Sequence, residues 1–167
     1  MLLGLSFLVF FAFLISVAAV YDFRYYTIPN AVSLALFVGF LVVSFIVDYT
    51  LQDVLISFLY ASLSMVIGFI LFCFGFIGGG DVKFYSALML WIGREEAFPF
   101  FILMAIAGGV MVLARLITWL FWHKIEMFPF SNHMKQLHDP LAYGICICVS
   151  AVAVFPVSPL FSKLLGL

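Results

Sequence analysis

The chain has few charged residues. Asp, Glu, Lys and Arg together make up 9% of its 167 residues, and the formal net charge is −1. Binding to nucleic acid depends on clustered Lys and Arg, and the sequence holds no such cluster, so nucleic acid is not expected as a partner. Cysteine is also scarce. Cys73, Cys146 and Cys148 form no Cys-x-x-Cys pair, which argues against both a disulfide framework and a zinc ribbon.

Apolar residues are abundant instead. They make up 67% of the chain, and the mean hydropathy is +1.31, whereas soluble domains are about 45–50% apolar. The chain is therefore expected to be an integral membrane protein surrounded by lipid. At about 20 residues per crossing, its apolar runs predict an all-α, polytopic protein in which residues 1–167 form one membrane-embedded domain. Its six transmembrane helices are expected at residues 2–20, 31–47, 54–77, 82–93, 97–121 and 141–157.

The first apolar run has a second interpretation, as a cleaved signal peptide. Ser16-Val17-Ala18 has the small residues of a cleavage site. However, no Lys or Arg precedes the run, and the run is too long for the apolar region of a signal peptide. We expect it to be retained as the first span.

The fourth apolar run is short. Residues 82–93 would make a helix of about 18 Å, less than the roughly 30 Å of the hydrocarbon core. Either this helix continues past Arg94-Glu95-Glu96, or it begins inside the membrane. In the second case the segment before it lies at membrane depth, which is tolerated only where backbone lines a water-filled cavity or is packed in protein.

Three glycines and an acid precede this short run. Gly78, Gly79 and Gly80 are followed by Asp81, and glycines adopt backbone angles closed to other residues, so we expect a bare loop that presents one carboxylate. Placing an acid between segments apolar enough to cross a membrane costs free energy, so such an acid indicates a functional site. Its expected partner is Asp22, which lies between the first two runs.

The distribution of basic residues predicts the orientation. The side that holds Asp22, Asp81 and segment 122–140 has four Lys or Arg residues, and the other side has only Arg94 and Lys163. Because Lys and Arg are enriched in cytoplasmic loops, Asp22 and Asp81 are expected at the cytoplasmic face of the cell membrane, with both termini outside. The four residues on that face are Arg24, Lys83, Lys124 and Lys135.

Two carboxylates on the same side could form a catalytic pair. Close carboxylates share a proton, so one can act as a general base on water while the other donates to a carbonyl oxygen, as in aspartic proteases. Helix ends suggest the roles: Asp81, at a helix N-terminus, as the ionised base and Asp22, at a helix C-terminus, as the acid. Alternatively, each acid is a plain helix cap or faces solvent. A proton-coupled transporter and a non-catalytic membrane assembly factor are the alternative functions.

Two motifs carry a resemblance to a known family. Gly78-x-Gly80-Asp81-x-Lys83, together with Asp22-x-Arg24-x-x-x-Ile28-Pro29-Asn30, resembles the type IV prepilin peptidases, the GxGD aspartic proteases of the membrane. The resemblance implies that Asp22 and Asp81 are catalytic. It also implies removal of a short basic leader from prepilin-like or preflagellin-like precursors at the cytoplasmic face. Segment 139–144 loosely resembles the proline-aromatic-glycine element that opens the family's last span.

The chain also departs from the larger members of that family. Those members carry a cytoplasmic insertion with paired Cys-x-x-Cys and N-methylate the new N-terminus, and this chain has neither feature. It resembles the small, peptidase-only members of tight-adherence pilus systems and some archaea. N-methyltransferase activity is therefore not expected, and neither S-adenosylmethionine nor any other cofactor is expected.

The remaining polar residues receive supporting roles. Gly78, Gly79, Gly80, Lys83 and Arg24 are assigned to the loops around the catalytic pair, with Lys83 and Arg24 expected mainly to mark the cytoplasmic side. The spacing of the three histidines fits no compact metal site, so no metal is expected; they are His123, His133 and His138. Glu126 and Asp139 are hypothesised to attract the basic leader of the substrate.

Overall fold

All regular structure in the described part of the chain is helical. The structure is a computed structural model, and it describes residues 2–47, 49–124 and 142–166. This part confirms the all-α prediction. The helices are α1 (Leu2–Tyr25), α2 (Asn30–Ile46), α3 (Leu51–Cys73), α4 (Gly79–Ile92), α5 (Ala97–Lys124), α6 (Tyr143–Val154), the 3-10 helix η2 (Phe155–Val157) and α7 (Pro159–Leu165).

The helices differ in their ability to cross a membrane. Gly4–Tyr25, Leu51–Cys73 and Ala97–Thr118 are long and apolar enough, and a fourth crossing results if the segments on either side of Ser158, which are bent by 58°, form one broken span. α2 is a shorter apolar helix. The chain is thus a membrane protein, and each of the six predicted runs contains a helix. Within the part of the chain that the structure describes, length and composition support three or four crossings, so the predicted six are not confirmed.

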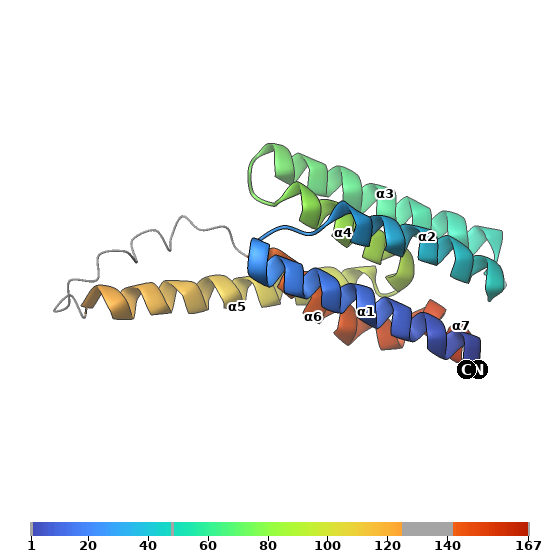
Figure 1. Cartoon of the computed structure of the whole chain (residues 1–167). Coiled ribbons are helices and arrows are strands. Elements are labelled where there is room, and N and C mark those ends of the chain that lie inside the picture. The colour runs from blue at the N-terminus through green and yellow to red at the C-terminus, as the bar shows by residue number, and fades with distance from the viewer. Residues whose placement is uncertain (1, 48, 125–141, 167) are drawn as a thin grey trace.

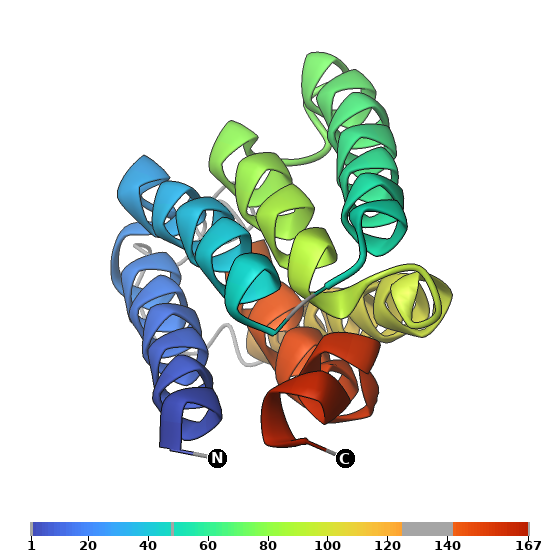
Figure 2. The same cartoon turned by 90° about the vertical axis from the view of Figure 1, so that its right-hand side faces the viewer.

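The helices pack in two layers. α1, α2, α4 and α3 lie side by side in that order, and α6 packs beneath α1 and α4 (Figure 2). α5 packs against α6 and then extends beyond the other helices (Figure 1). The end of α1, the start of α4 and the start of α6 lie at one end of the molecule, and the two termini lie at the other (Figure 1).

The first helix is longer than predicted. α1 continues to Tyr25, so Asp22 lies inside the helix rather than in the loop after residue 20, because nothing in residues 21–25 breaks a helix. The helix ends at Tyr25. The next residue, Tyr26, has a φ of 52°, in the left-handed region, and its N–H donates to the Asp22 carbonyl at 2.9 Å. Pro29 is the N-cap of α2, the residue just before the helix.

The glycine segment is mostly helical rather than a loop. Gly78 is the N-cap of α4, and Gly79 and Gly80 belong to its first turn. α4 ends at Ile92, before Gly93 with its positive φ of 78°, so it does not continue past Glu96. At 14 residues it is about 21 Å long, shorter than the roughly 30 Å of the hydrocarbon core. The first of the two alternatives, a helix that continues past Glu96, is therefore wrong.

A short C-terminal helix was not predicted. It follows the last predicted run, 141–157. Pro159 opens this helix, α7, because proline is well accommodated in the first turn of a helix. Ser158 caps this helix by accepting a hydrogen bond from the Phe161 N–H at 3.3 Å.

Trp91 joins several helices at the end of the core remote from Asp22. Its side chain is fully buried, and its indole N–H donates to the Leu36 carbonyl of α2 at 2.9 Å. The ring centroids of Phe11 on α1, Phe40 on α2 and Phe155 lie 5.1, 6.4 and 6.1 Å away. Buried aromatic pairs add about 0.5–1.5 kcal/mol beyond the area they bury, so this cluster fastens α1, α2 and α4 together.

A polar cluster forms at the same end. Lys163 of α7 pairs with Asp53 of α3 at 3.4 Å and lies 4.5 Å above the ring of Tyr49. Burial raises the pKa of Tyr49, and the charges of Asp53 and Glu95 act in the same direction. Asp53 and Lys163 therefore lie together, as the predicted layout requires.

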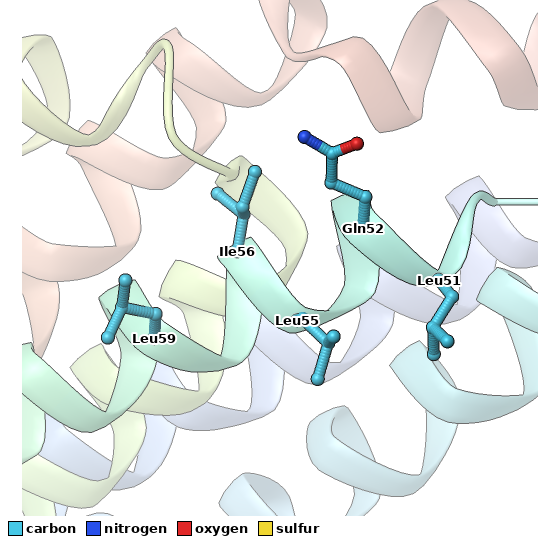
Figure 3. Close-up of a pocket in the computed structure, with 5 residues that line it drawn as sticks. All are labelled: Leu51, Gln52, Leu55, Ile56 and Leu59. Atoms are coloured by element: carbon cyan, nitrogen blue, oxygen red, sulfur yellow. The ribbon is translucent and has the colours of Figure 1, made fainter.

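The outer face of α3 is apolar. Leu55 and Leu59 are 60% and 64% exposed, and a surface hollow of about 410 Å³ runs along this face (Figure 3). Gln52 is the one polar residue among those that line it. In a membrane such a surface faces lipid, and the hollow offers no groups for chemistry.

We predict that Trp91→Phe destabilises the protein by about 1–3 kcal/mol, because it removes a buried hydrogen bond and part of a packed ring. The measurement is thermal unfolding in detergent micelles. Phe98→Leu, at a side chain that is 71% exposed, serves as the control and should leave the unfolding temperature nearly unchanged. Equal unfolding temperatures for the two variants would contradict the assigned role of Trp91.

Candidate active site

Asp22 is buried at the point where α1 meets the start of α6. Its side chain is 1% exposed. The Ile145 N–H donates to Asp22 Oδ2 at 3.0 Å, and the backbone of Gly144 adds a second hydrogen bond. The first N–H groups of a helix have no partner within that helix, and α6 has no side-chain cap of its own. Asp22 therefore caps α6 from a distant part of the chain.

Gly144 makes this contact possible. A Cβ atom at this position would lie 2.8 Å from both Asp22 Cγ and Asp22 Oδ2, and 2.7 Å from Ile28 Cδ1. Real Cβ atoms do not approach other atoms so closely. Only glycine allows the Asp22 carboxylate to reach the backbone of α6.

Asp81 lies at the start of α4. It is the third residue of the helix, and its carboxylate reaches back to accept a hydrogen bond from the backbone of Gly78, the N-cap. This is half of a capping box, so the interpretation of Asp81 as the N-cap itself is wrong. The side chain is partly exposed, and the positive end of the helix dipole favours a negative charge here.

The structure brings the two acids together. The Asp22 carboxylate and the Ile28 side chain both lie over Gly144, and the Ile28 backbone lies against Gly80, the neighbour of Asp81. The α1–α2 connection lies between them. A Cβ atom on Gly80, next to Asp81, would lie 3.2 Å from the Ile28 carbonyl oxygen, so this glycine also permits a close approach of backbone.

The other predicted site residues lie around the pair. Gly78, Gly79 and Gly80 form the start of α4. Lys83 donates to the side-chain oxygen of Asn30 at 3.1 Å, and Arg24 is exposed in the last turn of α1.

Two further sets of predicted residues cannot be placed at the site. Glu126 and Asp139, hypothesised to attract the leader, lie outside the described residues, as do His133, His138 and the side chain of His123. Within residues 2–47, 49–124 and 142–166, no group of three or more His, Cys, Asp or Glu side chains could hold a metal ion.

The donors from α6 were not predicted from sequence. Gly144 lies within the segment that loosely resembles the family's proline-aromatic-glycine element, but a backbone N–H has no sequence signature. One signal could have identified these donors. Gly144 directly precedes an apolar run, and no side chain near the start of that run can cap the helix.

Comparison with known families identifies the family of the chain. A family model, described as the type IV leader peptidase family, matches residues 8–113, which include Asp22 and Asp81. The chain belongs to the type IV leader peptidase family. Neither a curated protein nor a solved structure matches the chain. The family indicates a membrane peptidase that processes type IV prepilin-like substrates. The matched segment of this leader peptidase ends before α6, so the contacts of Gly144 and Ile145 with Asp22 come from the structure alone.

We predict that Gly144→Ala disrupts the site, because the new methyl group must displace Asp22 or Ile28. The expected cost is about 1–3 kcal/mol of stability, together with loss of peptidase activity. Gly109→Ala is the matched control, since a Cβ atom there meets nothing within 4 Å and alanine favours a helix by up to about 1 kcal/mol. Thermal unfolding in detergent and a peptidase assay measure both effects. A Gly144→Ala protein as stable and active as Gly109→Ala would contradict the contact.

Proposed function

We propose that this leader peptidase is an aspartic endopeptidase in which Asp22 and Asp81 activate a water molecule. The observation that carries the proposal is the convergence of these two acids, from α1 and α4, at one end of the helical bundle. The family membership supports the reaction class, and the contacts of Ile28 with Gly144 and Gly80, beside the two acids, support a shared site.

The proposed reaction needs only the pair and water. One carboxylate takes a proton from the water as its oxygen attacks the scissile carbonyl carbon, and the other gives a proton to the carbonyl oxygen. The tetrahedral intermediate then collapses, the C–N bond breaks, and the leaving amine takes up a proton from the pair.

The roles of base and acid are no longer distinguished by helix ends. That assignment considered Asp22 only at the C-terminus of α1, but Asp22 also lies at the N-terminus of α6. Both carboxylates therefore lie at positive helix ends. We describe them as a pair that shares a proton and titrates jointly.

The short α4 supports a site recessed from the membrane surface. Val82 packs over Gly68, where a Cβ atom would lie 2.7 Å from Val82 Cγ1, and Gly68 is five residues before the end of α3. At 1.5 Å per residue, Asp81 thus lies about one helical turn inside that end. We propose a single domain with six crossings in the cytoplasmic membrane. In this proposal the short α4 begins inside the hydrocarbon core, and the recess before it is open to cytoplasmic water.

The proposed substrates are type IV prepilin-like or preflagellin-like precursors, cut on the cytoplasmic side of their apolar helix. The scissile segment must be unwound, because the carbonyl groups of a helix are already hydrogen-bonded. The recess at the start of α4 offers backbone partners to such an extended segment. Removal of the leader is proposed without methyl transfer to the new N-terminus.

The test is cleavage of a co-expressed prepilin that has a basic leader and a glycine before the cut. We expect the wild type to process it and both Asp22→Asn and Asp81→Asn to be slowed by at least about 100-fold, because each variant keeps the shape and removes the acid. Asp53→Asn, at the opposite end of the bundle, is the matched control and should process normally. A gel shift and the mass of the new N-terminus give the readout.

Three results would overturn the proposal. Processing by both Asp22→Asn and Asp81→Asn would exclude the two-aspartate mechanism. No processing of any cognate precursor by a folded wild type would favour the assembly or transporter functions. A product 14 Da heavier than the free amine, the mass of an added methyl group, would contradict the absence of methyl transfer.

A further inference from the structure

The connection between α1 and α2 has one buried residue, Ile28, which follows the exposed Tyr26 and Thr27. Ile28 is only 6% exposed, although loops generally run over the surface. Its backbone lies against the first turn of α4, where a Cβ atom on Gly80 would be 3.2 Å from the Ile28 carbonyl oxygen and 3.4 Å from its nitrogen. Its Cδ1 lies against the first turn of α6, over Gly144. One residue thus separates the two helix starts.

Each of those two helix starts is associated with one aspartate. The start of α4 carries Asp81, and the start of α6 donates a hydrogen bond to Asp22. Gly144 contacts Asp22 directly, and Gly80 is the neighbour of Asp81 in the chain. The contacts therefore form a continuous series from Asp22 through Gly144, Ile28 and Gly80 to Asp81.

A hydrogen bond ties the same connection to α4. The Lys83 ammonium donates to Asn30 Oδ1 at 3.1 Å. Asn30 is the first residue of α2, and Lys83 follows Asp81 by two residues. This bond fixes the end of the connection to the turn that carries Asp81.

The start of the connection is also fixed. Tyr26 adopts the left-handed conformation, which costs a non-glycine residue roughly 1–2 kcal/mol. Such strained conformations persist only where the surrounding structure determines them, and they concentrate at functional sites. Here the turn comes four residues after Asp22 and directs Ile28 into the bundle.

We infer that Ile28 is a positioning residue that sets the separation of Asp22 and Asp81, with the Lys83–Asn30 hydrogen bond holding it in register. The inference rests on the proposed two-aspartate function. Ile28 contributes no group to the reaction. It fills the space between the starts of α4 and α6, and a displacement of about 1 Å at a catalytic group can reduce a rate by about 100-fold.

The test is a kinetic series at Ile28 with a purified prepilin substrate. Ile28→Ala should lower kcat by about 10–100-fold with KM within about twofold of the wild type. Ile28→Val, which removes the Cδ1 atom that lies over Gly144, should lower kcat several-fold, whereas Ile28→Leu keeps the volume and should recover most of the activity. If Ile28→Ala does not fold, the Ile28→Val value decides.

A matched control separates positioning from general stability. Leu160 is 1% exposed and lies on α7, which carries neither aspartate, so Leu160→Ala removes as many carbon atoms as Ile28→Ala. It should lower the unfolding temperature comparably, while kcat per folded molecule stays near the wild-type value. A wild-type kcat in folded Ile28→Ala and Ile28→Val, or an equal loss of kcat in Leu160→Ala, would overturn the inference.

A double-mutant cycle tests the tie between Lys83 and Asn30. Asn30→Ala and Lys83→Met should each lower kcat several-fold, and the double variant should be no slower than either single variant, because both remove one interaction. A Lys83→Met effect that persists undiminished in the Asn30→Ala background, or that falls on KM alone, would contradict the tie and assign Lys83 to substrate binding.

The outcomes separate this inference from the proposed function. If the wild type cleaves and the two Asp→Asn variants do not, the function stands, and the Ile28 series then decides the inference by itself. If the folded wild type does not cleave, the proposed function fails first and the positioning inference fails with it.

Discussion

A carboxylate buried among apolar helices needs hydrogen-bond donors, because an unpaired buried charge is strongly unfavourable. Asp22 receives its donors from the backbone at the start of α6. Since these donors are main-chain groups, they are present only when the whole of α6 is in place against α1. This requirement accounts for the absence of a side chain at Gly144, for the lack of a local cap on α6 and for the burial of Ile28 beside them.

Glycine performs the same task at the second aspartate. Gly80 lets the α1–α2 connection approach the first turn of α4, and Gly68 lets Val82 sink against α3. Glycine is a poor helix former, so helix propensity alone disfavours a helix that begins with Gly79 and Gly80. The close contacts of that turn outweigh the propensity, and they bring Asp81 to the level of Asp22.

Much of this arrangement could be predicted from sequence, but not all of it. The apolar runs predicted where helices would lie, and the spacing of the two motifs placed Asp22 and Asp81 on one side. The ends of helices were harder to predict. The identity of Tyr26 does not indicate a left-handed conformation, and a proline such as Pro159 can start a helix as readily as follow one. The hydrogen bond from Ile145 to Asp22 joins residues 123 positions apart, so no local pattern could reveal it, and without it the acid and base roles were assigned on incomplete grounds.

The Trp91 cluster has a mechanical consequence. It fastens α1, α2 and α4 at the end of the bundle remote from the aspartates, so it acts as a pivot for any relative tilt of α1 and α4. Ten residues separate Asp81 from Trp91, a lever arm of about 15 Å. Over that length, a tilt of about 4° displaces the free end by about 1 Å. Small rotations at the pivot are therefore amplified where the two carboxylates meet.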